Sequence, residues 1–336
     1  MKINANNRDY EGVLQIRTGS HLYGTNTETS DEDFSGIFLP SKYEVFGFET
    51  IEEIDNSVVS KDSEGKNTKD AIDFKYYEFR KFCKLALDCN PNILEHLFVN
   101  EENVVYISEV GRELLNLKNN FLVKQRILIK NFSYAKSQGH KMRLKPENYE
   151  NLKIVLEYLY NYIGTDTIIN MSNKEEQVKS RQLLVELATD INEKKMPIEF
   201  KDSFIKIGDL NFNKNINIKN TINSIETRIS SAGSRKVLWE QFGFDTKFGA
   251  NLIRLLLEGI ELLTDECLTF PLKEKELILD IKQGKYTLDE VLKLSEQLSN
   301  KLEIAYACSN LPLKSNYKII QEFVIDTIQS RIDIGR

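Results

Sequence analysis

The chain has 336 residues, of which 41% are hydrophobic and 29% are charged, and its formal net charge is −6. This length allows two domains with separate cores, and the negative charge excludes a surface that is basic overall, so nucleic-acid binding would need a local basic patch. No apolar run reaches the length of a membrane span, and the first residues lack the apolar segment of a signal peptide. The four cysteines form neither a CxxC pair nor a zinc-ligand spacing, so we expect reduced thiols in a cytoplasmic protein.

The segment from Thr18 to Gly36 carries the most informative pattern in the sequence. Residues 12–17 predict a short strand, and Gly19 after it permits a tight turn in which the backbone approaches a ligand closely. We expect Ser20 to cap the short turn that follows, where its hydroxyl and the nearby backbone N–H groups can face an anion. A strand that leads into a helix start in this way is typical of phosphate binding.

Two aspartates stand at the start of the next predicted strand, residues 31–39. Because side chains two apart in a strand point to the same face, Asp31 and Asp33 project together and Glu32 points away. Neighbouring carboxylates repel each other unless a cation lies between them, and Mg²⁺ prefers oxygen ligands that it can share with phosphates. A Gly-Ser turn or an Asp-x-Asp pair alone is usually structural, but together and in this order they favour a nucleoside triphosphate site with divalent metal.

This segment resembles the active-site signature of the DNA polymerase β-like nucleotidyltransferase superfamily, in which Gly-Ser, a short helix and Asp-x-Asp follow one another. It is most similar to the nucleotidyltransferases associated with RNA repair in bacteria and large phages. Their pattern appears here as Gly19-Ser20, Tyr23-Gly24, Ser30-Asp31, Asp33 and Gly36. The resemblance implies a transferase that moves a nucleotide from an NTP, such as ATP, to an acceptor hydroxyl and releases pyrophosphate, using two Mg²⁺ or Mn²⁺ ions.

A third carboxylate is expected on the strand predicted over residues 70–77. Metal-assisted nucleotidyl transfer needs a group near the acceptor hydroxyl that binds metal and helps to remove the proton. Asp73 is the first choice, and Asp70, which faces the other way at the strand's edge, is the alternative. In the family that the chain resembles, an acidic strand residue precedes a segment like residues 77–82 (YEFRKF), which favours Asp73. A surface carboxylate without function remains the other interpretation of Asp73.

The rest of the sequence predicts mainly helices, because apolar residues recur there at helical spacing. Asn90 and Pro91 indicate a helix start, and Thr287 with Glu290 forms a capping box. The sequence predicts helices over residues 78–87, 91–98, 108–117, 120–144, 152–163, 218–229, 243–264 and 287–302 and one more after 310, with 200–220 irregular and 230–234 a loop.

One group of basic residues lies on the helix predicted over 120–144. Lys136, His140 and Arg143 are spaced i, i+4 and i+7, which aligns them on one face of that helix. This face could contact substrate phosphates, and a solvated helix face is the alternative to which we give equal weight.

A second basic pair is Lys247 and Arg254, two turns apart on one helix face. The segment resembles a C-terminal signature of the same family, an Asp-Thr-Lys followed by a His-x-x-Arg-Leu-Leu-like run, and Asn251 stands where many relatives carry histidine. The two cations would either bind the nucleotide's phosphates or pair with nearby acids.

The resemblance implies an α+β protein, in which we expect two domains. A small mixed-sheet, polymerase β-like catalytic domain over 1–120 is followed by an all-α domain over 121–336 that completes the active-site cleft between them. The resemblance implies an RNA end, such as that of a damaged tRNA, as the acceptor. A protein or small-molecule acceptor, and a non-catalytic nucleotide or RNA sensor, are the alternatives; the oligomeric state and the preferred base are not predicted.

Overall fold

The structure is a computed structural model whose chain divides into two units. The first comprises Met1–Gly139 and Lys247–Arg336, and the second comprises His140–Thr246. The model describes residues 1–5, 8–28, 30–58, 72–142, 146–163, 193–213, 216, 218–233 and 236–334. Within these ranges, no helix is both long enough and apolar enough to cross a membrane.

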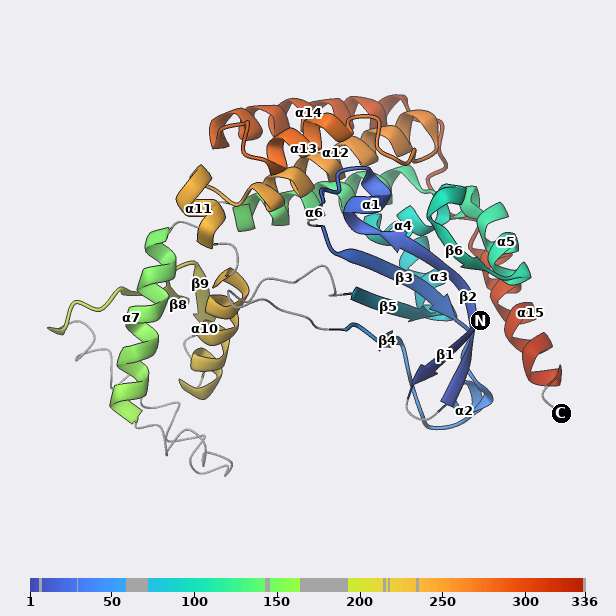
Figure 1. Ribbon diagram of the computed structural model, residues 1–336, viewed down its shortest axis with the longest axis horizontal. Helices are drawn as coiled ribbons and strands as arrows, with labels where there is room; N and C mark the ends of the chain where they lie inside the picture. The colour runs from blue at the N-terminus through green and yellow to red at the C-terminus, as the bar shows by residue number, and fades with distance from the viewer. Residues whose placement is uncertain are drawn as a thin grey trace. The chain divides into compact units, whose positions relative to one another are not determined.

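A six-stranded mixed sheet lies at the centre of the first unit, in the order β1-β2-β3-β5-β4 with β6 paired to β2 (Figure 1). Its strands are β1 (Lys2–Ala5), β2 (Arg8–Thr18), β3 (Glu32–Phe38), β4 (Glu53–Asp55), β5 (Ile72–Glu78) and β6 (Val104–Ile107). The three strands predicted from the sequence correspond to β2, β3 and β5. β3 and β5 run parallel with Asp33 opposite Asp73, and the other pairs are antiparallel. Because strand side chains alternate, this register places Asp33 and Asp73 on the same face of the sheet.

The two faces of the sheet differ in chemistry. Apolar side chains on one face form a buried cluster of Ile3, Tyr10, Phe38, Ile54 and Tyr76. The opposite face carries the buried apolar side chains of Leu14, Ile16 and Ile37 and, toward the starts of β3 and β5, polar side chains. Helix α4 (Pro91–Leu97) packs on this face. The contact is direct, because His96 of α4 lies 2.7 Å from the hydroxyl of Ser35 on β3. The polar ends of β3 and β5 are therefore the part of the sheet that can meet a ligand.

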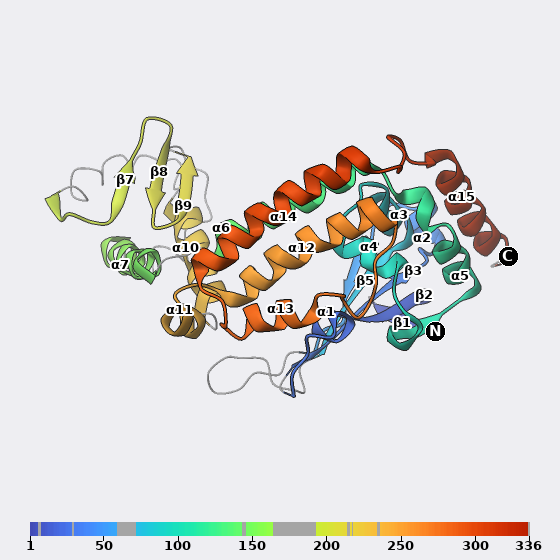
Figure 2. The ribbon, with the colours of Figure 1, turned by 90° about the horizontal axis from the view of Figure 1, so that it is seen from above.

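Helices make up the rest of the first unit and largely follow the predicted spans. They are α1 (Gly19–Tyr23), α2 (Lys42–Phe46), α3 (Phe79–Leu87), α5 (Glu109–Asn116), α6 (Lys124–Met142), α12 (Thr246–Asp265), α13 (Lys275–Lys282), α14 (Leu288–Cys308) and α15 (Tyr317–Ile334). α14 begins with the predicted capping box of Thr287 and Glu290. α12, α13 and α14 lie side by side in both views (Figures 1 and 2). A Cβ at Gly259 of α12 would lie 2.9 Å from Asn131 of α6 and from Leu302 of α14, so this glycine allows three helices to meet closely.

The second unit has its own core and is not wholly helical. Its described elements are α7 (Pro146–Ile163), β7 (Ile198–Phe200), β8 (Phe204–Ile207), β9 (Leu210–Asn213), α10 (Ile218–Gly233) and α11 (Lys236–Phe242). The three strands form an antiparallel sheet, whose buried isoleucines join those of α10 in one cluster. Residues 198–213 thus form a sheet where the sequence predicts irregular chain, and α10 runs to Gly233 through most of the predicted loop. The strands are only three or four residues long, too short to produce a clear alternating pattern.

The fold class is α+β, as predicted, but the units divide the chain elsewhere than at residues 120 and 121. Most of α6, α12 from Lys247 onward and all of α13–α15 belong with the sheet in the first unit. Long-range contacts explain this division. The ring of Phe323 on α15 packs edge-on against the ring of Phe79, with 5.7 Å between the ring centres, and Lys124 donates to the carbonyl of Ser309. The sequence pattern predicts consecutive helices, which suggests one helical domain. In the structure, the chain returns to the first unit after residue 246.

Candidate functional site

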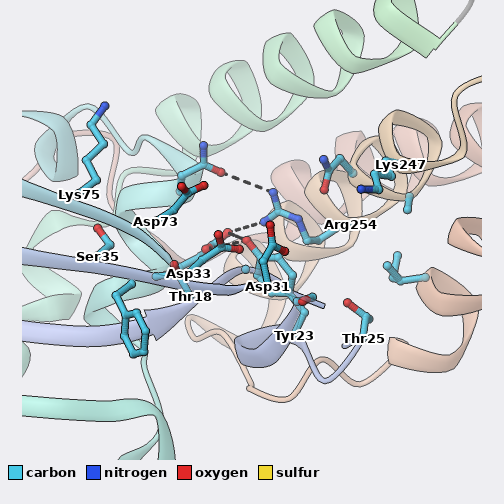
Figure 3. Close-up of a pocket in the computed structure, with 18 of the residues that line it drawn as sticks. Thr18, Tyr23, Thr25, Asp31, Asp33, Ser35, Asp73, Lys75, Lys247 and Arg254 are labelled. Atoms are coloured by element: carbon cyan, nitrogen blue, oxygen red, sulfur yellow. Dashed lines mark hydrogen bonds and ion pairs between the residues drawn. The ribbon is translucent and has the colours of Figure 1, made fainter. Parts of the chain in front are cut away.

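A pocket of about 470 Å³ opens beside the polar ends of β3 and β5. It is bounded by the turn at α1, by α4 and by one face of α12 together with the end of α13 (Figure 3). All of its lining residues belong to the first unit, whereas the sequence predicts a cleft between two domains. The helices predicted to complete the site do so from within the same unit as the sheet.

Three aspartates meet in this pocket, and they are the three that the sequence singles out. Asp31 immediately precedes β3, Asp33 lies on it, and Asp73 is opposite Asp33 on β5 (Figure 3). Burial, followed by the charges of Asp31 and Asp73, raises the pKa of Asp33 to about 6. Burial and the charge of Asp31 also raise the pKa of Asp73. The repulsion implied by these shifts is what a bound cation would relieve.

Glu32 is directed away from this group, as strand alternation predicts. Its carboxylate pairs with Arg17 at 3.2 Å, and it does not line the pocket. The alternation therefore separates two site carboxylates from a neighbour that serves only a surface ion pair.

The carboxylates suit a metal that is shared with substrate better than a cage built by the protein alone. In the part of the chain that the structure describes, no three His, Cys, Asp or Glu side chains are grouped closely enough to hold a metal ion by themselves. Mg²⁺ in nucleotide-binding sites is usually held by one or two carboxylates, by water and by the substrate's phosphates. The donor chemistry of Asp31, Asp33 and Asp73 fits that arrangement.

Gly19 brings the turn into direct contact with Asp33. It has φ +63°, and a Cβ there would lie 2.2 Å from Oδ2 of Asp33. A side chain at this position would therefore be strained by the backbone and would also collide with a site carboxylate. Glycine is needed here for both reasons.

Ser20 lines the pocket but does not have the predicted capping role. The N-cap of α1 is Thr18, whose side chain makes no capping hydrogen bond, and Ser20 lies inside the helix. The helix thus starts at Gly19, one residue earlier than the pattern indicates.

Two lysines face the aspartates from the helical side. Lys247 lies at the start of α12 and Lys282 at the end of α13, and both line the pocket. Lys282 donates to the carbonyl of Thr25 at 3.3 Å. Burial and the charge of Lys247 lower the pKa of Lys282, while Asp31 and Asp33 oppose that shift. Lys282 has no motif around it in the sequence, and only the packing of α13 reveals it.

Arg254 lines the same pocket, but its guanidinium is engaged by acids. It is 5% exposed, and its Nη1 donates to Glu95 and, at 2.8 Å and 3.1 Å, to both carboxylate oxygens of Glu258. Its guanidinium also lies 4.5 Å from the ring centre of Tyr23. Of the two predicted roles, phosphate binding or pairing with acids, the structure shows the pairing.

The described residues of the first basic group do not line this pocket. Lys136 and His140 are exposed on α6 and are not among its lining residues. Arg143 falls outside the described residues, as does Asp70, the alternative to Asp73. The structure therefore offers no reason to prefer the substrate-contact interpretation of Lys136 and His140 over a solvated face.

Several polar side chains that the sequence analysis did not select also line the pocket. Ser35, Lys75 and Tyr77 follow Asp33 and Asp73 at steps of two along β3 and β5. The same alternation that groups the aspartates was therefore a sufficient signal for these three residues. His96, which comes from α4, had no comparable signal.

His96 is a buried neutral histidine in this wall. Its Nδ1 lies 3.1 Å from the carbonyl of Asn92, so Nδ1 carries the proton and donates, and Nε2 accepts from the Ser35 hydroxyl. Burial lowers the pKa of His96 to about 4 from its ordinary 6.5. The charged form is thus disfavoured in the folded protein.

We expect the pKa of His96 to make folding sensitive to mild acid. Because the folded-state value lies below the unfolded one, the stabilisation is present above pH 6.5 and is lost as the pH falls toward 4, by up to about 3 kcal/mol. Urea unfolding at pH 7.5 and 4.5 measures this loss, and His96→Gln should reduce it because glutamine does not titrate. Equal losses in the wild type and the variant would contradict the assignment.

Comparison with known proteins agrees with the motif. Residues 3–198 match the family model described as RlaP, the RNA repair pathway DNA polymerase beta family. The chain is also similar to an uncharacterized 38.9 kDa protein in the nrdC-mobD intergenic region of Enterobacteria phage T4, with 27% identity over 306 residues that cover 87% of this chain and 89% of that protein. No solved structure matches the chain.

Proposed function

Because the chain belongs to the RNA repair pathway DNA polymerase beta family, we propose that it is a nucleotidyltransferase that moves an NMP from an NTP to an acceptor hydroxyl. The observation that carries this proposal is the pocket in which Asp31, Asp33 and Asp73 lie beside the Gly19 turn and opposite Lys247 and Lys282. Acids on one side and cations on the other suit a triphosphate with its divalent metal.

In this proposal, the triphosphate lies between the turn and the helices. Gly19 and Ser20 contact it through the backbone and the hydroxyl, while Lys247 and Lys282 neutralise its terminal phosphates. In this proposal, Lys247 makes the phosphate contact expected of it from the sequence. Lys282 makes the second phosphate contact, which was expected of Arg254.

The three aspartates would hold Mg²⁺ or Mn²⁺, two ions in all, and Asp73 would stand nearest the acceptor. The acceptor oxygen attacks the α-phosphorus, the bond from that phosphorus to the pyrophosphate oxygen breaks, and the acceptor's proton passes to Asp73. The ions supply charge neutralisation at the phosphates and a lower pKa for the acceptor hydroxyl. Most of the remaining catalysis is the positioning of two reactants in line.

We propose an RNA end as the acceptor, which is supported by the family's description as part of an RNA repair pathway. The four cysteines are free, which is consistent with a reducing cytoplasm. Protein or small-molecule acceptors remain outcomes of the test below.

The test incubates the protein, Mg²⁺ and each of the four α-labelled NTPs with RNA that ends in a free 3′-hydroxyl. The same RNA with a blocked 3′ end, a protein mixture and a reaction without acceptor are the matched controls. Label that appears on the free-ended RNA alone supports the proposal. In a separate binding measurement, contacts to the RNA phosphates should make the affinity for RNA fall steeply as the salt concentration rises. Label on protein would identify a protein nucleotidyltransferase, and NTP binding without any transfer would identify a sensor.

A further inference from the structure

Three residues that line the pocket remain without a role in the reaction: Tyr23 and Arg254, which belong to the segments that resemble the family, and Glu95. They come from α1, α4 and α12, and the structure joins them in one cluster with Glu258, in which Tyr23 is half-buried and the other three are buried. We call these four residues the Arg254 cluster, and we propose that it is a positioning device that holds the Gly19–Tyr23 turn in the place where it binds the NTP. This inference rests on the proposed function.

Hydrogen bonds link the turn to the cluster. The hydroxyl of Tyr23 donates to both carboxylate oxygens of Glu95, at 3.0 Å and 2.9 Å, and Arg254 donates to one of the same oxygens. Burial raises the pKa of Tyr23 well above its ordinary value, so the hydroxyl remains a donor. A carboxylate that receives these three contacts is fixed in position between two helices and the turn.

The ring and backbone of Tyr23 are held as well. Its ring lies under the guanidinium of Arg254, and its carbonyl accepts from the backbone N–H of Leu272 at 3.2 Å. Gly24, the next residue, has φ +70°, and a Cβ there would lie 2.7 Å from Pro271. The end of the turn is therefore held by Arg254, Pro271 and Leu272 as well as by Glu95, while its start at Gly19 contacts Asp33.

The charges of the cluster indicate which of the two glutamates is ionised and holds Tyr23. Two glutamates and one arginine, all more than nine-tenths buried, would leave an uncompensated negative charge if both acids were ionised. Glu95 accepts hydrogen bonds from Tyr23 and from Arg254, which favours its ionised form, whereas the hydrogen bonds to Glu258 come from Arg254 alone. Burial raises the pKa of both glutamates, that of Glu258 to about 8, and at Glu95 the charge of Arg254 and the hydrogen bond from Tyr23 oppose the shift. A single proton shared by the pair is therefore placed on Glu258. Glu95 is therefore the charged link to the turn.

The test uses Tyr23→Phe, which keeps the ring over Arg254 and removes only the hydroxyl, and Glu95→Gln, which keeps the size of the acceptor. If the cluster positions the turn, each variant should raise the KM for NTP about tenfold, the effect of losing a hydrogen bond to a charged group, while kcat changes little. The double variant should raise the KM no more than the single variant with the larger effect, because both changes act on the same link between Tyr23 and Glu95.

A structural role alone predicts a different result. Asp209→Asn, which breaks the Arg228 ion pair in the second unit, is the control, and it should lower the melting temperature without changing the KM. If Tyr23→Phe and Glu95→Gln behave like this control, or lower kcat at unchanged KM, the positioning role is wrong. Calorimetric Kd values for a non-hydrolysable NTP with Mg²⁺ separate this inference from the reaction. If the wild type binds the NTP but transfers nothing, the proposed function is refuted, and the Kd values of the variants decide the positioning role. If the wild type binds no NTP, both proposals are refuted.

Discussion

Asp33→Asn is expected to lower the rate of nucleotidyl transfer by about 10²–10³-fold, the loss seen when one group that stabilises transition-state charge is removed. Asp33 lies beside Gly19 and opposite Asp73, and burial together with the neighbouring carboxylates raises its pKa to about 6. Asparagine has the same shape but lacks the charge that a divalent ion requires. The measurement is kcat with labelled NTP at saturating Mg²⁺.

The fold should survive this change. Because burial and the neighbouring carboxylates disfavour the ionised form of Asp33, a neutral side chain should leave the melting temperature unchanged or raise it. The adjacent Glu32→Gln, which removes a charge that pairs with Arg17 outside the pocket, is the matched control and should retain nearly full activity. Equal losses of activity in the two variants would show that the overall charge of this strand, and not the site, is what matters.

Gly19→Ala is expected to have the second large effect, through geometry. The added methyl would lie 2.2 Å from Oδ2 of Asp33, so either the turn or the carboxylate must move. A displacement of about 1 Å in a reacting group costs about 10²-fold in rate, and the left-handed backbone adds about 1–2 kcal/mol of instability. Transfer kinetics and thermal unfolding of the same preparation measure the two effects.

Gly243→Ala separates backbone strain from collision with the site. Gly243 has φ +78°, but a Cβ there would have nothing within 4 Å. This control should show the loss of stability and retain the activity. A Gly19→Ala protein that is no less active than the Gly243→Ala protein would mean that the close approach of the turn to Asp33 is not needed for the reaction.

Many residues of the candidate site could be selected from local spacing in the sequence. Gly19, Asp31 and Asp33 follow from a turn residue and from strand alternation, both of which extend over only a few residues of chain. The same rule, applied further along β3 and β5, would also have selected Ser35 and Lys75. The structure groups these side chains as the spacing indicates, because the side-chain directions of a strand depend on its own backbone.

Contacts between distant segments lay beyond this reasoning. A sequence pattern could place Arg254 on a helix face near Lys247, but it could not tell phosphate from carboxylate as its partner. That choice depends on Glu95, 159 residues earlier in the chain, with which Arg254 pairs. The predicted domain boundary failed for a related reason, since helical periodicity identifies an apolar face without saying what it packs against.

By itself, the sequence determined the strands β2, β3 and β5, most of the helices, and the positions of the turn and its aspartates, because each of these depends on residues close together in the chain. The α+β class followed from the resemblance of these segments to a known family. Only the tertiary structure decided that α12–α15 return to the first unit, that Lys282 faces the aspartates, and that Arg254 is held by glutamates. Each of those outcomes is set by which surfaces are buried together when the chain closes long loops, and that free energy belongs to pairs of segments rather than to either segment alone.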